Sequence, residues 1–152
     1  MYIISFVYNL MLKKILSVLA GLTTATVVVS LLELALPHIY PPPPEFDPAV
    51  KAQTVESMRQ WISMMPLSAY FYVIVTYALA AFAGGSIATL ISPTWGRVPL
   101  WLIIGIALMI TESFDIIPYG YPVWFTCVSM LSYIPLAYIG SKTVLKKKLE
   151  IA

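Results

Sequence analysis

Residues 33–44 read ELALPHIYPPPP, and this stretch decides the fold because a long apolar segment ends within it. It holds an acidic residue, Glu33, and the only histidine of the chain, His38, and it closes with four consecutive prolines. Proline lacks a backbone donor and favours extended polyproline II geometry. We therefore expect the preceding helix to stop at Pro37 and the proline run to form a rigid spacer.

A second stretch of the same kind occupies residues 112–122 and reads ESFDIIPYGYP. Both stretches contain Pro-x-x-Tyr-Pro, and both carry carboxylates just before it: Glu33 in the first, and Glu112 and Asp115 in the second. We interpret the chain as two helical hairpins, each of which turns at one of these motifs. The match indicates either an internal repeat or two independent turns with the same local chemistry.

Composition places the chain in a membrane. Hydrophobic residues make up 60% of its 152 residues and charged residues 11%. Soluble domains contain about 45–50% and about 25% respectively, so a chain this apolar cannot cover its surface with polar groups. We infer that lipid is its solvent, and we predict a single membrane domain over residues 1–152. The only cysteine, Cys127, lies in an apolar run and is interpreted as a packing residue.

Four apolar segments are long enough to cross a bilayer, which takes about 20 residues in a helix. The first is interpreted as a retained signal-anchor helix, because it exceeds the roughly 7–15 apolar residues of a signal peptide. The residues before it form either an interfacial segment, which we favour, or an extension of this span, unless the true start is Met11. The predicted spans cover about residues 15–36, 67–91, 99–117 and 123–141.

A fifth helix is predicted over about residues 48–65, with Asp47 as its N-cap and Pro48 at its first position. Its apolar residues recur at spacings of three and four, which is typical of an amphipathic helix on a membrane surface or over a bundle. These residues are Val55, Met58, Ile62 and Met65, with Trp61 beside them. The predicted fold is therefore an all-α integral membrane protein: a four-helix transmembrane bundle of two hairpins plus one amphipathic surface helix.

The second span carries small residues four positions apart in two neighbouring rows. Small residues let another helix backbone approach closely, and close packing holds helices together in lipid. We predict a helix-packing face here, whose partner lies either within the chain or in another protein. The face consists of Ala80, Gly84 and Ala88, with Ala81 and Gly85 alongside.

Lysine and arginine residues near the helix ends predict the orientation, because cytoplasmic loops carry the excess of positive charge. Two of them, Lys51 and Arg59, fall on one side of the predicted membrane. Seven fall on the other: Lys13, Lys14, Arg97, Lys142, Lys146, Lys147 and Lys148. We predict an integral protein of the bacterial cytoplasmic (inner) membrane with both termini in the cytoplasm.

The carboxylates are the main chemical feature. Ionisable residues inside a span are costly and commonly functional. Glu33, His38, Glu112 and Asp115 are therefore candidates for an ion or proton site at the outer mouth of the bundle, where His38 could titrate near neutral pH. Alternatively, each acid pairs with a backbone donor, a tyrosine hydroxyl or a basic residue. One histidine and scattered carboxylates do not make a zinc site, so no metal and no cofactor is predicted.

Two functions from different classes fit these features. No catalytic motif is present, so a non-enzymatic role is expected. The first hypothesis is an accessory or structural subunit that packs against partner membrane proteins or forms a homo-oligomer; nucleic-acid binding is not expected. The alternative is a small transporter or channel with an acidic mouth between the two hairpins. A dry interior filled by Leu and Ala, with an exposed small-residue groove, would favour the first, and polar residues that converge on a cavity at mid-membrane depth would favour the second.

Overall fold

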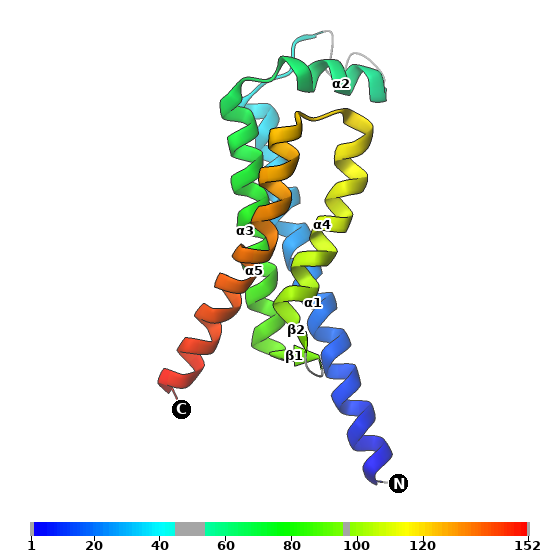
Figure 1. Ribbon diagram of the computed structural model, residues 1–152, viewed down its shortest axis with the longest axis vertical. Helices are drawn as coiled ribbons and strands as arrows, with labels where there is room; N and C mark the ends of the chain where they lie inside the picture. Colours follow the sequence, from blue (N-terminus) through cyan, green and yellow to red (C-terminus); the bar gives the residue numbers. More distant parts are fainter. Residues whose placement is uncertain (1, 45–53, 96–97, 152) are drawn as a thin grey trace.

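The computed structural model describes residues 2–44, 54–95 and 98–151. Its elements are α1 (Tyr2–Ile39), α2 (Val55–Met64), α3 (Leu67–Ile91), β1 (Thr94–Trp95), β2 (Val98–Pro99), α4 (Leu100–Tyr119) and α5 (Val123–Ile151). The four long helices pack as a bundle, α2 lies across one end of it, and both ends of the chain lie at the opposite end (Figure 1). The structure thus confirms the predicted fold class, an all-helical bundle of four apolar helices with one short additional helix.

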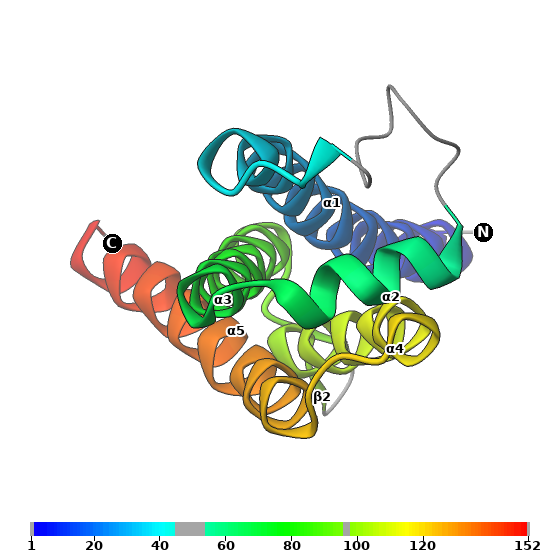
Figure 2. The same cartoon turned by 90° about the horizontal axis from the view of Figure 1, so that it is seen from above.

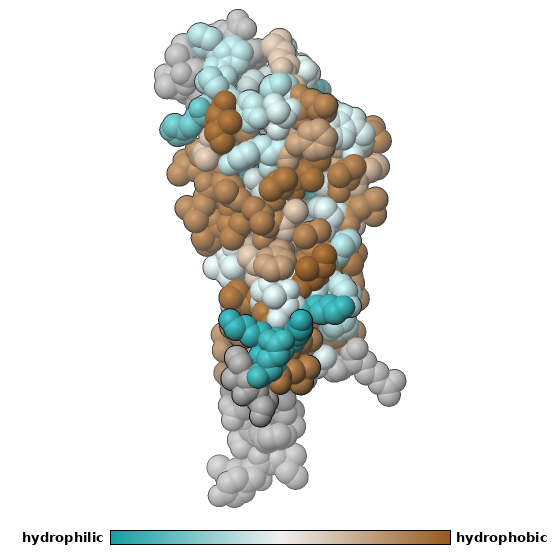
Figure 3. Space-filling model, turned by 90° about the vertical axis from the view of Figure 1, so that its left-hand side faces the viewer, coloured by the Kyte–Doolittle hydropathy of each residue, from teal (hydrophilic) through white to brown (hydrophobic). Residues whose placement is uncertain are grey.

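Four helices have the length and hydropathy of membrane spans. The candidate spans have mean hydropathies between 1.5 and 2.2 and less than half of each is buried by protein, so their outer faces need lipid. On the face shown in Figure 3, hydrophobic residues cover most of the middle of the molecule, with more hydrophilic residues towards its upper and lower parts. The spans are Met11–Ile39, Leu67–Ile91, Leu100–Tyr119 and Val123–Lys147.

The N-terminal helix differs from the prediction at both ends. Its backbone is continuous from Tyr2, so the first residues extend α1 instead of forming a separate interfacial segment. At the other end, the expectation that the helix stops at Pro37 is wrong, because α1 continues to Ile39. A proline removes only its own helical hydrogen bond, and the amide of Tyr40 still donates to the carbonyl of Leu36 at 2.8 Å.

In both Pro-x-x-Tyr-Pro motifs the first proline lies within the last turn of a helix, but the residues that follow differ. Pro37 lies inside the last turn of α1, and Pro118 lies inside the last turn of α4. Gly120 follows α4 with a φ of 68°, a left-handed conformation that glycine adopts without strain. Both motifs lie at the end of the bundle that α2 covers (Figure 1). Whether this likeness reflects duplication stays a prediction.

The short helix α2 begins with a capping box. The Thr54 hydroxyl accepts from the Ser57 amide at 3.1 Å, and the Thr54 amide donates to the Ser57 hydroxyl at 2.9 Å. The residues predicted to start this helix, Asp47 and Pro48, lie outside the described residues. Seen from above, α2 crosses the end of the bundle (Figure 2).

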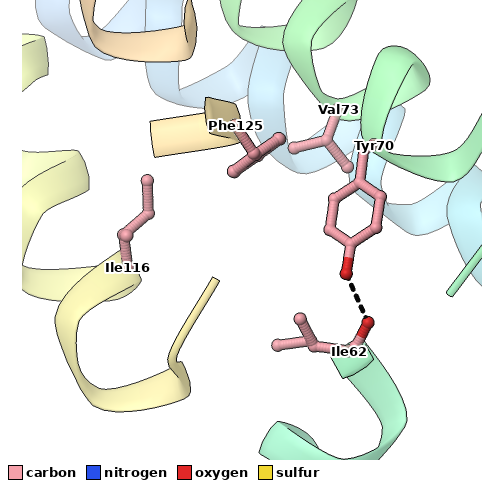
Figure 4. Close-up of a cluster of buried hydrophobic side chains, with 5 residues drawn as sticks. All are labelled: Ile62, Tyr70, Val73, Ile116 and Phe125. Carbon is pink, nitrogen blue, oxygen red and sulfur yellow. Dashed lines mark hydrogen bonds between the residues drawn. The ribbon is translucent and has the colours of Figure 1, made fainter. Parts of the chain in front are cut away.

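Two contacts fasten α2 to the helices below it. The buried hydroxyl of Tyr70 in α3 donates to the Ile62 carbonyl at 2.6 Å, and Arg59 donates to the Pro118 carbonyl at 2.9 Å. Ile62 is 1% exposed and joins Tyr70, Val73, Ile116 and Phe125 in a buried cluster (Figure 4). The amphipathic helix is therefore a packed roof on the bundle.

The predicted packing face of α3 is buried within the chain. Helix α3 contacts α1, α4 and α5. A Cβ atom on Gly84 would lie 2.8 Å from the carbonyl oxygen of Gly21 in α1, and one on Gly85 would overlap the carbonyl of Ala137 in α5. All five small residues of this face are buried. The face thus joins α3 to two helices of its own chain, and no exposed small-residue groove remains on it.

Hydroxyl groups add hydrogen bonds between these helices. Ser17 of α1 donates to the Ala88 carbonyl, and Thr89 donates to Ser141 of α5 at 2.8 Å, both in buried positions.

In contrast, Cys127 is exposed on α5, so its interpretation as a packing residue is wrong. Its side chain points away from the bundle, where lipid would cover it.

Candidate functional site

A polar pocket of about 240 Å³ lies among the four long helices. Glu33 of α1 faces it from one side, and Glu112 and Asp115 of α4 from another. Tyr77 of α3 and Tyr133 of α5 also line it. Smaller hydroxyl groups complete the polar lining: Thr26, Ser30 and Thr111. The structure therefore brings together three of the four predicted site residues, from stretches that are far apart in the sequence.

Glu112 is the most unusual residue of the pocket. It is 4% exposed, and neither carboxylate oxygen has a hydrogen-bond partner among the described residues. The hydroxyls of Ser129 and Tyr133 lie nearby without completing a hydrogen bond. Leaving a buried polar group unsatisfied costs about 1–3 kcal/mol, and more for a charged group. Such a group in a folded protein points to an ion, a water molecule or a proton that the carboxylate receives.

The other two acids lie where the pocket opens. Both Glu33 and Asp115 are exposed, and they lie close enough to repel each other electrostatically. The Tyr77 hydroxyl donates to Glu33 Oε1 at 3.4 Å, which is a weak contact. Glu33 therefore has one of the tyrosine partners that the sequence suggested, but this single bond leaves its carboxylate free to bind a second group.

A second pocket, of about 390 Å³, lies directly beneath α2. It shares Glu33, Tyr77 and Asp115 with the first pocket, so the two adjoin at these side chains. Helix α2 contributes the apolar stripe that was predicted from its sequence: Met58, Trp61, Ile62 and Met65. We call this the roof pocket and the first one the carboxylate pocket. Glu112 lines only the carboxylate pocket, whereas Glu33 and Asp115 line both.

Tyrosines dominate the wall of the roof pocket. Tyr77, Tyr119 and Tyr121 all line it. Burial raises the pKa of Tyr121, and the negative charge of Glu33 raises it further. The phenol therefore stays neutral at physiological pH and can donate a hydrogen bond or offer its ring face.

His38 does not belong to the site. Its side chain is exposed and lines neither pocket. Its Nδ1 lies 3.2 Å from the carbonyl oxygen of Leu34, one turn back in its own helix. The structure therefore separates His38 from the three acids.

The sequence analysis did not identify Tyr133, Tyr77 or Trp61 as site residues. Trp61 was placed beside the apolar stripe of the predicted surface helix. Tyr133 had one usable signal, since a tyrosine deep in an apolar span needs a polar neighbour for its hydroxyl.

The charge of the two pockets is one-sided. Among the described residues that line them, three are acidic and none is lysine or arginine. However, no group of three or more His, Cys, Asp or Glu side chains in the described parts of the chain is arranged to hold a metal ion. The lining thus suits a cation that does not need several carboxylate ligands at once.

These features define a class, an integral membrane protein with four candidate spans and an acidic pocket inside its helical bundle. No family model matches the chain, and no curated protein or solved structure matches it either. Its chemistry must therefore be inferred from its own residues.

Proposed function

We propose that this chain is a small transporter or channel for cations, with Glu112 as the central binding group and Glu33 and Asp115 at the mouth. The observation that carries the proposal is the buried, unpartnered carboxyl group of Glu112 inside a pocket. Burying this carboxyl group without a partner costs folding free energy, and a role in binding a cation or proton would explain why the group is present. Acidic residues inside membrane spans commonly mark ion or proton pathways. The role is non-enzymatic and needs no cofactor.

The sequence criterion for choosing between the two functions favours this proposal. Polar side chains converge on a cavity, and the small-residue face of α3 is occupied by helices of the same chain. Both observations support transport or conduction over the accessory-subunit hypothesis.

The orientation is part of the proposal. The two chain ends and the β1–β2 hairpin lie at one end of the bundle, and α2 lies at the other (Figure 1). The positive-inside rule then favours a bacterial inner membrane with both termini in the cytoplasm and the roof pocket outside. Two residues of the charge comparison, Lys51 and Arg97, lie outside the described residues.

The decisive experiment is cation flux into liposomes that contain the purified chain. Sodium, potassium and proton gradients would be applied in turn and read with entrapped fluorescent dyes. We expect flux of at least one of these cations, and its loss in Glu112→Gln, which keeps the side-chain size but cannot carry the charge. Glu150→Gln is the matched control, because Glu150 is an exposed acid near the end of α5. Absence of flux for all three cations, or wild-type flux in Glu112→Gln, would refute the proposal.

One observation still favours the accessory-subunit hypothesis. The N-terminal part of α1 extends beyond the bundle (Figure 1), and the first apolar residues of its candidate span are largely exposed, with Met11 51%, Leu12 41% and Ile15 42% exposed. Such an apolar helix can pack against a partner membrane protein or a second copy as well as against lipid. Stoichiometric co-purification of another membrane protein after mild detergent extraction would support this second function, and a monodisperse single chain would oppose it.

A further inference from the structure

We propose that the roof pocket is an aromatic cage for substituted ammonium ions, such as a quaternary ammonium group. This inference rests on the proposed function, since the cage shares Glu33 and Asp115 with the carboxylate pocket. It adds a ligand class for the roof pocket, organic cations, beside the inorganic cations or protons proposed to bind at Glu112.

Four aromatic side chains from different parts of the fold surround the roof pocket. Trp61 comes from α2, Tyr77 from α3, Tyr119 from the end of α4, and Tyr121 from the α4–α5 turn. The face of an aromatic ring carries negative electrostatic potential and attracts a cation within about 6 Å of its centre. Several rings around one space are the recurrent protein solution for binding quaternary ammonium groups.

The rest of the lining suits the outer surface of such an ion. Apart from the two acids and the tyrosine hydroxyls, the walls are apolar: Leu36, Pro37, Met58, Ile62, Met65 and Ile116. An alkylated ammonium ion has an apolar surface and is weakly hydrated, so it loses little on entering. A small, strongly hydrated ion such as sodium would lose its water shell and find few oxygen ligands in return.

Other ligand classes fit the roof pocket less well. Anions are repelled by Glu33 and Asp115, and none of the described residues that line the space is basic. A neutral apolar molecule would bury these two carboxylates without compensating their charge. The volume of about 390 Å³ lies within the range of about 300–1,000 Å³ that small-molecule sites occupy. A single organic cation is therefore the ligand that satisfies the charge, the surface and the size.

The roof holds its tryptophan in place. Trp61 precedes Ile62, whose carbonyl accepts the Tyr70 hydrogen bond and whose side chain is 1% exposed. Two residues before Trp61, Arg59 donates to the carbonyl of Pro118. Arg59 also pairs with Glu56 at 3.5 Å and does not line the pocket. Trp61 therefore lies on a helix that is fastened to α3 and α4, and the described lining of the pocket holds no lysine or arginine.

The test is calorimetric binding to the full chain in bilayer discs of phosphatidylethanolamine and phosphatidylglycerol, which contain no choline. The probe is choline, and its neutral carbon isostere, 3,3-dimethylbutan-1-ol, is the reference. We expect choline to bind and the isostere to show no binding. Equal binding of the two compounds, or no binding of choline, would overturn the inference.

Two substitutions of Trp61 test whether choline binds to the face of its indole ring. Trp61→Leu keeps an apolar side chain but removes the aromatic ring, so choline binding should weaken by about three- to thirty-fold. Trp61→Tyr restores a ring and should restore most of the affinity. Phe114→Leu is the control, because Phe114 is an aromatic residue that is 75% exposed on the outside of α4. Unchanged choline affinity in Trp61→Leu would overturn the inference.

The quaternary ammonium group could come from a free solute or from a lipid headgroup. A parallel titration with short-chain dihexanoylphosphatidylcholine distinguishes them: preferential binding of choline indicates a solute, and preferential binding of the lipid indicates a headgroup. Both outcomes support the cage if they depend on Trp61. Inorganic-cation flux that depends on Glu112, without choline binding, would refute the cage alone. Trp61-dependent choline binding without any Glu112-dependent flux would refute only the proposed transport.

Discussion

Replacing Glu112 with leucine should stabilise the protein and abolish its flux. Glu112 is 4% exposed and its two carboxylate oxygens have no hydrogen-bond partner in the described parts of the chain. The substitution removes an unsatisfied polar group that costs about 1–3 kcal/mol and leaves an apolar side chain of similar size in its place. We therefore expect the free energy of unfolding to rise by about 1–3 kcal/mol.

The expected sign makes this test informative, since most substitutions destabilise a protein by about 1 kcal/mol. For a chain of this size, the gain corresponds to a rise in Tm of about 2–12 °C, at about 2–4 °C per kcal/mol. Thermal unfolding of the detergent-solubilised protein, followed by tryptophan fluorescence, measures it. The Glu112→Leu protein in liposomes should conduct no cations. Loss of function with a gain in stability is common when a binding-site residue is replaced.

The matched control is Glu150→Leu. Glu150 forms an exposed pair with Lys146 at 3.8 Å, and such pairs contribute little to stability. Its Tm should stay close to that of the wild type. If Glu112→Leu instead lowers the unfolding free energy by 1 kcal/mol or more, the carboxyl group is a structural partner of Ser129 or Tyr133. Our reading of Glu112 as a ligand-binding group would then be refuted.

Three further predictions concern packing. Gly85→Val should lower the unfolding free energy by about 1–3 kcal/mol in SDS titrations, because the Cβ of the valine would overlap the Ala137 carbonyl of α5. An unfolding midpoint equal to that of the wild type would show instead that α3 and α5 separate easily. Tyr70→Phe removes the hydrogen bond to the Ile62 carbonyl and should lower the unfolding free energy by about 0.5–1.5 kcal/mol. Protease cleavage within α2 should also become faster, and an unchanged cleavage rate would contradict the conclusion that this bond fastens α2 to α3. A double-mutant cycle of Thr89→Val and Ser141→Ala should give a coupling energy of about 0.6 kcal/mol, and strictly additive effects would exclude the bond.

Most of the architecture could be predicted because membrane insertion depends on local composition. Hydropathy alone locates four apolar segments, and the structure places a helix at each. The capping box at Thr54 and Ser57 was not predicted, because Ser57 takes the position that glutamate or glutamine usually occupies in this motif. The error at Pro37 came from treating proline as an absolute stop, although one lost hydrogen bond near a helix end is easily tolerated.

The candidate site was predictable in part, and simple helix geometry explains which part. Each residue turns an α-helix by about 100°, so Glu112 and Asp115, three apart, differ by about 60° and can face one pocket. His38 is five residues after Glu33, which turns it about 140° away. This argument could have excluded His38 from the sequence alone. The meeting of Glu33 with the α4 acids, and with Tyr133, depends on helix pairing that the sequence does not encode locally.

The position of α3 between α1 and α5 has a consequence for how the protein is made. Thr89 and its hydrogen-bond partner Ser141 are 52 residues apart in the sequence. At about 5–20 residues per second, the ribosome needs roughly 3–10 s to synthesise the chain between them. During that interval lipid, or an insertion chaperone, must cover the side of α3 that α5 later occupies. The acidic pocket, to which α5 contributes Tyr133, is therefore completed only after α5 has docked against α3.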